Sequence, residues 1–304
     1  VLRIMSTHTN HGHTMFRPSS LSQIIGQKAV VNQLKIAIFS AKKRNDSLPH
    51  ILLLSPPGCG KNSLCEAIKH ERDVDMQYVN AASVKNIVHL LHYFRKVSEN
   101  SILFIDEIHR LNISVEEWLY TVLEDFKYTF ECEQYELPRF TVIGATTKAG
   151  SLSNPLYDRF VLKFSLSNYS VIELANIIKQ SAFKSKINIT DKACISLAKA
   201  SRGVPRVANN NLSWVRDFCV GCGHSKIECK HVVSSLKMSG IDENGLDNDD
   251  KKYLSVLRRT NKPIGLKNLS LLTNIAEETI ETKIEPFLLR LGLVQKTSKG
   301  RILV

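Results

Sequence analysis

The stretch 51–63, with the sequence ILLLSPPGCGKNS, constrains the fold of this 304-residue chain more than any other. Four consecutive apolar residues predict a buried strand, and the prolines and glycines after them cannot continue it, so the chain must turn. Lys61 then precedes a segment, 63–70, with the pattern of a helix. A strand, a glycine-rich turn, a lysine and a helix in this order are typical of a phosphate-binding loop.

Such a loop holds phosphate groups by simple electrostatics. Backbone N–H groups around the glycines surround the phosphate oxygens, and the helix N-terminus adds the positive end of its dipole. Lys61 would reach the β- and γ-phosphates of a nucleotide. We expect ATP to contact Pro57, Gly58, Cys59, Gly60, Lys61, Asn62 and Ser63.

Two residues depart from the usual pattern of the loop, GxxxxGK[ST]. Ser55 stands in place of the first glycine, and Asn62 stands in place of the Ser or Thr whose hydroxyl normally binds Mg²⁺. The amide oxygen of Asn62 is a substitute metal ligand on a longer side chain. A plain Gly/Pro turn after a strand is the alternative interpretation of the stretch.

Two later strands predict the rest of a hydrolytic site. The apolar run that starts at Ser101 ends in Asp106 and Glu107, about forty residues after the loop. Asp106 would hold Mg²⁺, and Glu107 would activate the attacking water. The run 141–147 (TVIGATT) is a further strand, and its closing hydroxyls, Thr146 and Thr147, would lie near the γ-phosphate.

Strands that alternate with helical segments predict an α/β fold with a parallel sheet. From residue 169 to 239 the pattern is helical, and residues 251–304 read as helices followed by a basic hairpin, a winged-helix layout. The predicted regions are a tail (1–15), a large ATPase domain (16–166), a helical lid domain (167–240), an acidic linker (241–250) and a winged-helix domain (251–304).

Net charge and cysteine usage indicate the partner and the compartment. A formal charge of +12 favours an acidic partner such as nucleic acid, and the winged-helix hairpin would place Lys296, Lys299 and Arg301 against the backbone of double-stranded DNA. Seven scattered cysteines favour a reducing cytoplasm. No apolar run approaches the ~20 residues of a membrane span, so we expect no membrane association.

Several motifs together resemble one family. They are Arg17-Pro18 with Ile25-Gly26-Gln27, then 103–111 (LFIDEIHRL), 143–147 (IGATT), 155–160 (PLYDRF) and 202–206 (RGVPR). In this respect the chain is similar to the RuvB family, the AAA+ motors of bacterial Holliday-junction branch migration. The resemblance runs from residue 16 to residue 301 and includes elements that a generic P-loop ATPase lacks.

The resemblance implies a role for each matching residue. Asp106 and Glu107 serve metal binding and water activation, and Thr147 or its neighbour Thr146 senses the γ-phosphate. Arg159 resembles an arginine finger that acts on the nucleotide of the next subunit, which implies the family's homo-oligomeric ring, a hexamer. Further nucleotide contacts fall on Arg17, Pro18, Ile25, Pro205 and Arg206. The function implied is ATP-driven translocation on double-stranded DNA during recombination and repair.

Two further departures from the family pattern have consequences. Tyr157 stands where a second arginine is usual. The segment 126–140, a predicted hairpin, is several residues shorter than the hairpin with which family members dock on their partner RuvA, and it carries Glu131, Glu133 and Glu136. We therefore expect a RuvA-type partner to bind weakly or not at all through this hairpin.

Other interpretations remain open. Asn62 favours a non-hydrolysing or slow AAA+ ring subunit that uses nucleotide as a structural switch, whereas a clamp-loader-like ATPase would lack the winged helix. The residues Cys219, Cys222, His224, Cys229 and His231 have zinc-ligand types. Their placement at the end of one predicted helix and the start of the next favours an ordinary loop.

Overall fold

The computed structural model describes residues 18–304, so the predicted tail and Arg17 lie outside the described residues. The chain divides into two compact units. The first runs to Tyr169 and includes Val204–Arg206, and the second comprises Ser170–Gly203 and Val207–Val304. Each unit is described by itself.

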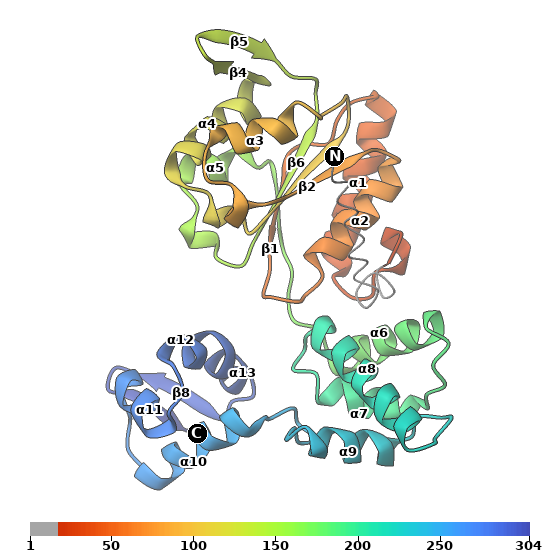
Figure 1. Cartoon of the computed structure of the whole chain (residues 1–304), viewed down its shortest axis with the longest axis vertical. Coiled ribbons are helices and arrows are strands. Elements are labelled where there is room, and N and C mark those ends of the chain that lie inside the picture. Colours follow the sequence, from red (N-terminus) through yellow and green to blue (C-terminus); the bar gives the residue numbers. More distant parts are fainter. Residues whose placement is uncertain (1–17) are drawn as a thin grey trace, which may run out of the picture. The chain divides into compact units, whose positions relative to one another are not determined.

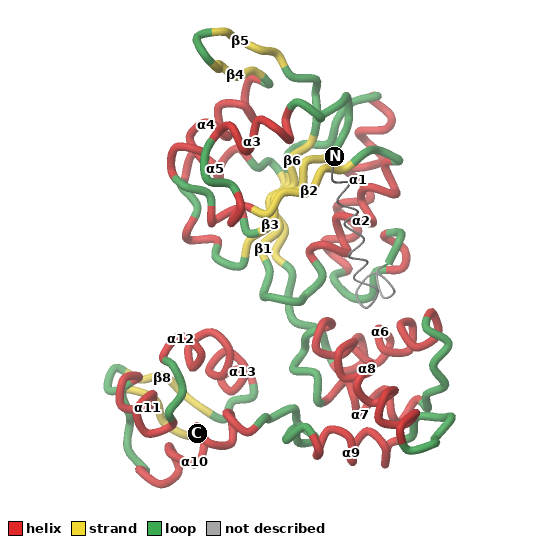
Figure 2. The backbone as a smooth tube through the Cα atoms, viewed as in Figure 1, coloured by secondary structure: helices red, strands yellow, loops and turns green. Residues whose placement is uncertain are grey.

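A five-stranded parallel sheet forms the centre of the first unit (Figures 1 and 2). Its strands, in spatial order, are β2 (Met76–Asn80), β3 (Ile102–Asp106), β6 (Thr141–Thr146), β1 (Ile51–Leu54) and β7 (Leu162–Ser165). Every neighbouring pair is parallel. The sheet confirms the predicted fold class, and it places β6 between the strand before the phosphate loop and the strand that ends in the two carboxylates.

Helices cover both faces of this sheet because successive strand residues point to opposite sides. Ile51 and Leu53 pack in the cluster that includes α1 (Lys28–Arg44) and α2 (Lys61–Arg72). Leu52 packs in the other cluster, with α3 (Ile87–Phe94), α4 (Ile113–Asp125) and the short α5 (Asn154–Arg159). Figure 1 shows α1 and α2 on one side of the strands and α3 and α4 on the other.

A hairpin follows α4, as the sequence predicts. Its strands are β4 (Lys127–Phe130) and β5 (Glu133–Glu136), paired antiparallel. The two connecting residues, Glu131 and Cys132, both have positive φ angles of 51° and 67°. Two left-handed residues match the right-handed twist of the strands, so a two-residue turn is enough to connect β4 to β5.

The second unit starts with four helices: α6 (Val171–Lys184), α7 (Asp191–Lys199), α8 (Pro205–Gly221) and α9 (Cys229–Met238). The first two residues of α8 belong to the first unit. All four agree with the helical pattern of the sequence. Ser170 begins α6 with a capping box, in which its hydroxyl accepts from the backbone N–H of Glu173 and the Glu173 carboxylate accepts from the backbone of Ser170.

The rest of the second unit has the winged-helix order. It contains α10 (Asn248–Thr260), α11 (Leu266–Thr273), a helical segment over residues 277–290 and the hairpin of β8 (Val294–Thr297) and β9 (Gly300–Leu303). The segment 277–290 consists of α12 (Glu277–Thr279), a π-helical turn (Ile280–Ile284) and α13 (Glu285–Arg290). Pro286 has no N–H to donate and its ring crowds the preceding turn, which accounts for the widened turn before it.

The structure differs from the sequence-based prediction in two places. The predicted linker 241–250 extends too far, because α10 begins at Asn248 and Asp250 is fully buried. Strand β7 and helix α5 were not predicted. Among residues 18–304, no helix is long and apolar enough to cross a membrane.

Candidate active site

The phosphate loop connects β1 to α2 with two left-handed glycines. Gly58 has φ 80° and Gly60 has φ 100°, conformations that residues with a Cβ rarely adopt. A Cβ on Gly58 would lie 2.8 Å from the side chain of Val204. Helix α2 begins directly after Gly60, so its unpaired N–H groups and the positive end of its dipole face the loop. The loop therefore has the backbone geometry of an anion-binding cradle.

Lys61 is the cation of this cradle. Only 7% of the residue is exposed, and its Nζ donates to the carbonyl oxygen of Ser55 at 3.4 Å. Burial lowers the pKa of Lys61, while the negative charges of Glu107 and Asp106 oppose that shift. The charged form of Lys61 is therefore sustained by the two carboxylates that the sequence assigns to catalysis.

Those carboxylates lie at the end of β3. Asp106 is the last residue of the strand, and its Oδ1 accepts a hydrogen bond from the backbone N–H of Glu107 at 3.0 Å. Burial and the neighbouring charge of Glu107 raise the pKa of Asp106, and Lys61 partly opposes them. A bound divalent cation would favour the ionised carboxylate, and oxygen is the donor type that Mg²⁺ selects, so the residues fit this ion.

Asn62 is the other residue that the sequence predicts as a metal ligand. It is the second residue of α2 and is half-buried. Its side chain carries an amide oxygen, an acceptable Mg²⁺ donor, but it lacks the hydroxyl that the loop pattern expects. The donor set that the sequence predicts is thus the Asp106 carboxylate with a weaker, neutral second ligand.

Glu107 is held by hydroxyl and imidazole groups. It adopts a left-handed conformation with φ 52°, which is uncommon for a residue with a side chain. Thr147 Oγ1 donates to Glu107 Oε2 at 3.2 Å, and His109 Nδ1 lies 3.3 Å from the same oxygen. Thr146 is fully buried; its hydroxyl lies 2.8 Å from His109 Nδ1 and accepts from the N–H of Lys148.

These contacts distinguish the two predicted threonines. The Thr146 hydroxyl already has two partners within the protein, so it positions His109, whereas the half-buried Thr147 touches Glu107 itself. His109 was not predicted as a site residue. The sequence feature that could have identified His109 is its position, two residues after Glu107 and three after Asp106, where a buried strand ends.

The predicted lead-in is tied to the end of the first unit. The Gln27 side chain makes two hydrogen bonds with the backbone of Ser167, and Pro18 and Ile25 are half-buried on the same lead-in. Two residues after Ser167, the hydroxyl of Tyr169 donates to the carbonyl of Cys59 in the phosphate loop at 3.3 Å. Tyr169 was not predicted, and no sequence motif marks it.

The lid motif also reaches the phosphate loop. Pro205 is the first residue of α8, where its missing N–H is harmless. The backbone N–H of Arg206 donates to the carbonyl oxygen of Gly58 at 3.3 Å. The Arg206 cation, like Lys61, opposes the rise in the pKa of Asp106 that burial and Glu107 cause. Arg206 therefore belongs to the same charged cluster as Lys61, Asp106 and Glu107.

The predicted arginine finger lies at the end of α5. Its Nη2 lies 2.5 Å from Glu124 Oε2 on α4, and both side chains are substantially exposed. The Nε of Arg159 is buried and has no hydrogen-bond partner in the part of the chain that the structure describes. The neighbouring Tyr157 is half-buried, with the ammonium group of Lys163 4.6 Å from its ring centroid.

The predicted DNA contacts fall into two groups. Lys299 is exposed at the tip of the β8–β9 hairpin. Arg301 Nε donates to Glu285 Oε1 at 2.7 Å, and Lys296 Nζ lies 2.5 Å from Glu285 Oε2. Glu285 is fully buried; burial would raise its pKa, but the bonds from Arg301 and Lys296 outweigh this effect and lower it.

This pairing changes the interpretation of Arg301. Its side chain is only 14% exposed, and it anchors the hairpin to α13, so the structure gives it a structural role in place of a free phosphate contact. Lys296 is 45% exposed and shares the same carboxylate. Lys299 is the predicted DNA contact that lies outside this ion pair.

The cysteine- and histidine-rich loop between α8 and α9 is packed without a metal-like cluster. The rings of His224 and His231 stack with centroids 4.2 Å apart, and His231 Nδ1 accepts from the backbone of Glu228. Within residues 18–304, no group of three or more potential ligand side chains could hold a metal ion.

Comparison with known proteins extends this picture to the whole chain. Residues 16–166 match the family model of the Holliday junction DNA helicase RuvB P-loop domain. Residues 169–242 match the RuvB AAA lid domain, and residues 243–304 match the RuvB C-terminal winged helix domain.

Individual relatives agree with these matches. The chain is 40% identical over 298 residues to the Holliday junction branch migration complex subunit RuvB of Campylobacter jejuni, covering 95% of this chain and 89% of the relative. The corresponding Helicobacter pylori protein is 40% identical over 295 residues, with 94% and 88% covered. The solved Thermotoga maritima RuvB Holliday junction branch migration motor superposes with a TM-score of 0.85 at 35% identity, covering 95% and 96% of the two chains. The chain therefore belongs to the RuvB family.

Proposed function

We propose that this protein is an ATP-driven motor that moves double-stranded DNA during Holliday-junction branch migration. The observation that carries the proposal is the convergence of three strand ends. The phosphate loop follows β1, Glu107 follows the last β3 residue, Asp106, and Thr147 follows the last β6 residue, Thr146. Strand β6 lies between the other two strands. Relatives with this family assignment are named as branch migration subunits.

Hydrolysis would proceed by attack of water on the γ-phosphate. Glu107 would accept the proton of that water, and Thr147 and His109 orient the carboxylate for this task. Lys61 and the N–H groups of the loop would bind the phosphate oxygens and stabilise the negative charge that develops on them. Mg²⁺, held by Asp106 and the Asn62 amide, would neutralise charge on the β- and γ-phosphates when bound.

Arg159 would complete the site of a neighbouring subunit. An arginine finger supplied in trans is typically worth ~10³–10⁵ in rate. Supply in trans requires adjacent subunits, and a hexameric ring is the arrangement proposed here. The exposed pairing of Arg159 with Glu124 supports this role, because an exposed ion pair is weak enough to be exchanged for a phosphate.

The winged-helix hairpin would contact the DNA backbone, with Lys299 as the exposed cation that lies outside the ion pair of Glu285. Such contacts hold the duplex without reading its sequence. A RuvA-type partner is proposed to dock weakly on the β4–β5 hairpin. Support comes from its two-residue turn and from Tyr128, which is buried in the core of the first unit instead of being presented to a partner.

An ATPase assay tests the proposal and separates it from a nucleotide switch without turnover. The purified chain is assayed with Mg²⁺, with and without duplex DNA, beside the Glu107→Gln variant. We expect DNA-stimulated turnover in the natural chain and a loss of at least ~10²-fold in the variant, because general base catalysis contributes ~10²–10⁴-fold. Tight ATP binding without turnover in either protein would favour the alternative of a non-hydrolysing ring subunit.

A further inference from the structure

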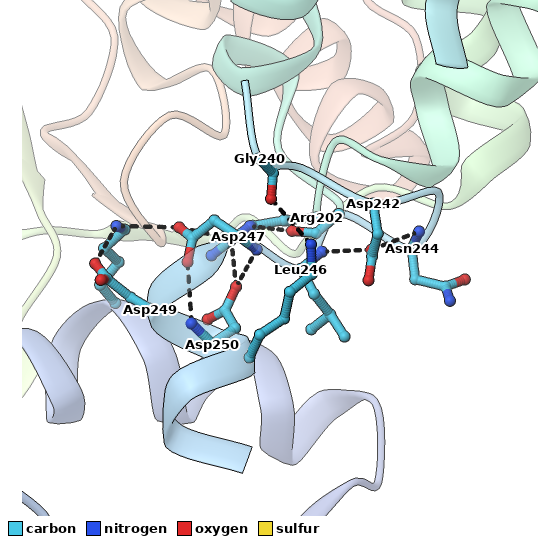
Figure 3. Close-up of polar contacts among 11 residues, drawn as sticks. Arg202, Gly240, Asp242, Asn244, Leu246, Asp247, Asp249 and Asp250 are labelled. Atoms are coloured by element: carbon cyan, nitrogen blue, oxygen red, sulfur yellow. Dashed lines mark hydrogen bonds and ion pairs between the residues drawn. The ribbon is translucent and has the colours of Figure 1, made fainter. Parts of the chain in front are cut away.

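Arg202 joins the helical lid to the winged-helix domain inside the second unit. Its Nη2 lies 2.5 Å from Asp250 Oδ2 and 3.0 Å from Asp247 Oδ2, and its Nε donates to the carbonyl of Gly245 at 2.9 Å. Figure 3 shows the guanidinium group reaching both carboxylates at the start of α10. One side chain from the turn after α7 thus contacts the backbone and two acids of the next domain.

The carboxylate partners are built into the fold. Asp247 and Asp250 form the capping box of α10, in which each side chain accepts from the backbone N–H of the other. Asp250 is fully buried, and its Oδ1 has no hydrogen-bond partner among residues 18–304. Burial raises the pKa of Asp250 to about 6, against the opposing effects of the Asp247 N–H and of Arg202. The buried acid therefore depends on Arg202 for its charge compensation.

Helix α13 contacts Arg202 from the other side. The guanidinium carbon lies 4.6 Å from the centroid of the Phe287 ring, and Arg290 donates to the carbonyl oxygen of Arg202 at 2.9 Å. A Cβ on Gly245 would lie 2.8 Å from the carbonyl oxygen of Ala200, so the backbones themselves approach closely at this joint. Cation–π stacking and a buried ion pair together fix the side chain in one orientation.

The same short segment also reaches the nucleotide loop. Arg202 and Gly203 both adopt left-handed conformations, with φ of 55° and 74°, and turn the chain between α7 and α8. Val204 and Arg206 follow at once, and within the first unit they pack against Gly58. Arg202, which is anchored on the winged-helix domain, therefore lies only four positions before Arg206, which lies beside the phosphate loop.

We infer that Arg202 is a positioning residue that couples DNA held by the winged-helix domain to the nucleotide held by the phosphate loop. This inference rests on the proposed function. A force on the winged-helix domain acts on α10 and α13, and the Arg202 joint passes it to the segment that carries Arg206. If the joint is loosened, each domain still folds and binds its own ligand, but the two sites no longer influence each other.

The test uses the full chain and an isosteric variant. Asp250→Asn removes the charge that pairs with Arg202 and keeps the shape of the side chain. The readout is the ratio of ATPase rates with and without duplex DNA, together with the ratio of DNA affinities with and without a non-hydrolysable ATP analogue. Linkage requires that DNA and nucleotide change each other's affinity by the same factor. In typical allosteric proteins this factor is about 5–150.

We expect Asp250→Asn to keep the ATPase rate without DNA within about twofold and to bring both ratios close to one, because coupling is then lost while each site remains. Arg202→Lys, which keeps a charge but not the planar fork, should behave similarly and guards against a folding defect in the first variant. The matched control is Lys179→Ala, which removes an exposed ion pair with Asp191 elsewhere in the lid. It should retain both ratios.

The outcomes separate the inference from the proposed function. If the natural chain shows no DNA stimulation, the proposed function fails and the coupling role fails with it. If the natural chain is stimulated and both variants, folded by circular dichroism, keep their ratios, the coupling role of Arg202 alone is overturned. Loss of coupling in Lys179→Ala as well would also overturn it, since the effect would then not depend on this joint.

Discussion

Arg159 on α5 pairs with Glu124 on α4, with 2.5 Å between Nη2 and Oε2. The pair holds the proposed arginine finger within its own subunit. Both side chains are more than a third exposed, and exposed ion pairs contribute only about 0–1 kcal/mol. In the proposed ring, the γ-phosphate of a neighbouring subunit would therefore replace Glu124 at little energetic cost.

Catalysis that depends on assembly follows from this arrangement. Arg159→Ala should retain ATP binding and lose turnover by ~10³-fold or more, because the finger acts on the neighbouring site. Mixing it with Lys61→Ala should restore partial turnover, since each subunit can supply the group that the other lacks. Steady-state ATPase of the parents and of mixtures at several ratios is the measurement.

Glu124→Gln is the matched control for that experiment. It removes the partner of the finger within the same subunit but leaves the finger itself. Turnover should therefore stay within about fivefold of the natural chain if the pair is worth under about 1 kcal/mol. Mixtures that never exceed either parent, under conditions in which rings exchange subunits, would contradict the trans assignment.

Asn62 should limit the rate. Asn62→Thr would place a hydroxyl where the loop pattern expects a Mg²⁺ ligand, and we expect a higher turnover at low Mg²⁺ concentration and a lower Mg²⁺ requirement. Titration of ATPase activity with Mg²⁺ for both proteins measures this. A variant with unchanged Mg²⁺ dependence would show that Asn62 is not a metal ligand here.

His50 should make the ATPase domain sensitive to acid. The ring is buried, its Nδ1 accepts from the backbone N–H of Val142, and its Nε2 lies 3.1 Å from the carbonyl of Leu123, so the neutral ring is bonded at both nitrogens. Burial lowers the pKa of His50 to about 4 from the usual 6.5. Stability from this residue is thus fully present above pH 6.5 and is lost as pH falls towards 4.

Linkage gives the size of that effect. Between about pH 7 and about pH 5 the depressed pKa of His50 removes roughly 2 kcal/mol from the free energy of unfolding. In His50→Asn this side chain cannot titrate. The free energy of unfolding of the variant should therefore fall by about 2 kcal/mol less between about pH 7 and about pH 5, although the variant is less stable at neutral pH. Urea unfolding in a Trp214→Phe background, in which Trp118 is the remaining tryptophan, reports on this domain. Parallel pH profiles for the two proteins would rule out the role of His50.

Lys299 and Arg301 should differ in their effects on DNA binding and stability. Lys299→Ala should lower the slope of log affinity against log salt by about one while leaving the melting temperature unchanged. Arg301→Ala leaves the buried Glu285 partly uncompensated and should cost about 3–5 kcal/mol of stability. The test is duplex binding at several salt concentrations, with thermal melting of each variant. If Arg301→Ala loses as much DNA affinity as Lys299→Ala and is not destabilised, Arg301 is a phosphate contact after all.

Sequence patterns predicted the features that depend on local order. The strand–loop–helix around Lys61, the β3 carboxylates and the four lid helices follow from apolar periodicity and glycine placement, and the structure contains them. Side-chain partners that are distant in sequence could not be predicted in this way. Glu285 pairs with Arg301 sixteen residues away, and no local pattern distinguishes that pair from a free basic hairpin.

The acidic segment 241–250 illustrates the same limit. Its composition is typical of an exposed linker, and only the fold reveals that Asp250 is buried against Arg202, forty-eight residues earlier. His109 and Tyr169 were missed for a related reason. Each acts through a hydrogen bond to a residue on a different element or loop, and such bonds depend on how the strands align.

The central claim is that ATP turnover at this site moves DNA strands. The most direct measurement is the conversion of a synthetic four-way junction with homologous arms into two duplexes, followed by gel electrophoresis with and without a RuvA-type partner. The account predicts ATP-dependent conversion by the natural chain and none by Glu107→Gln, with equal junction binding by both proteins. Conversion that proceeds equally well with Glu107→Gln, or active ATP hydrolysis without any conversion in either condition, would contradict it.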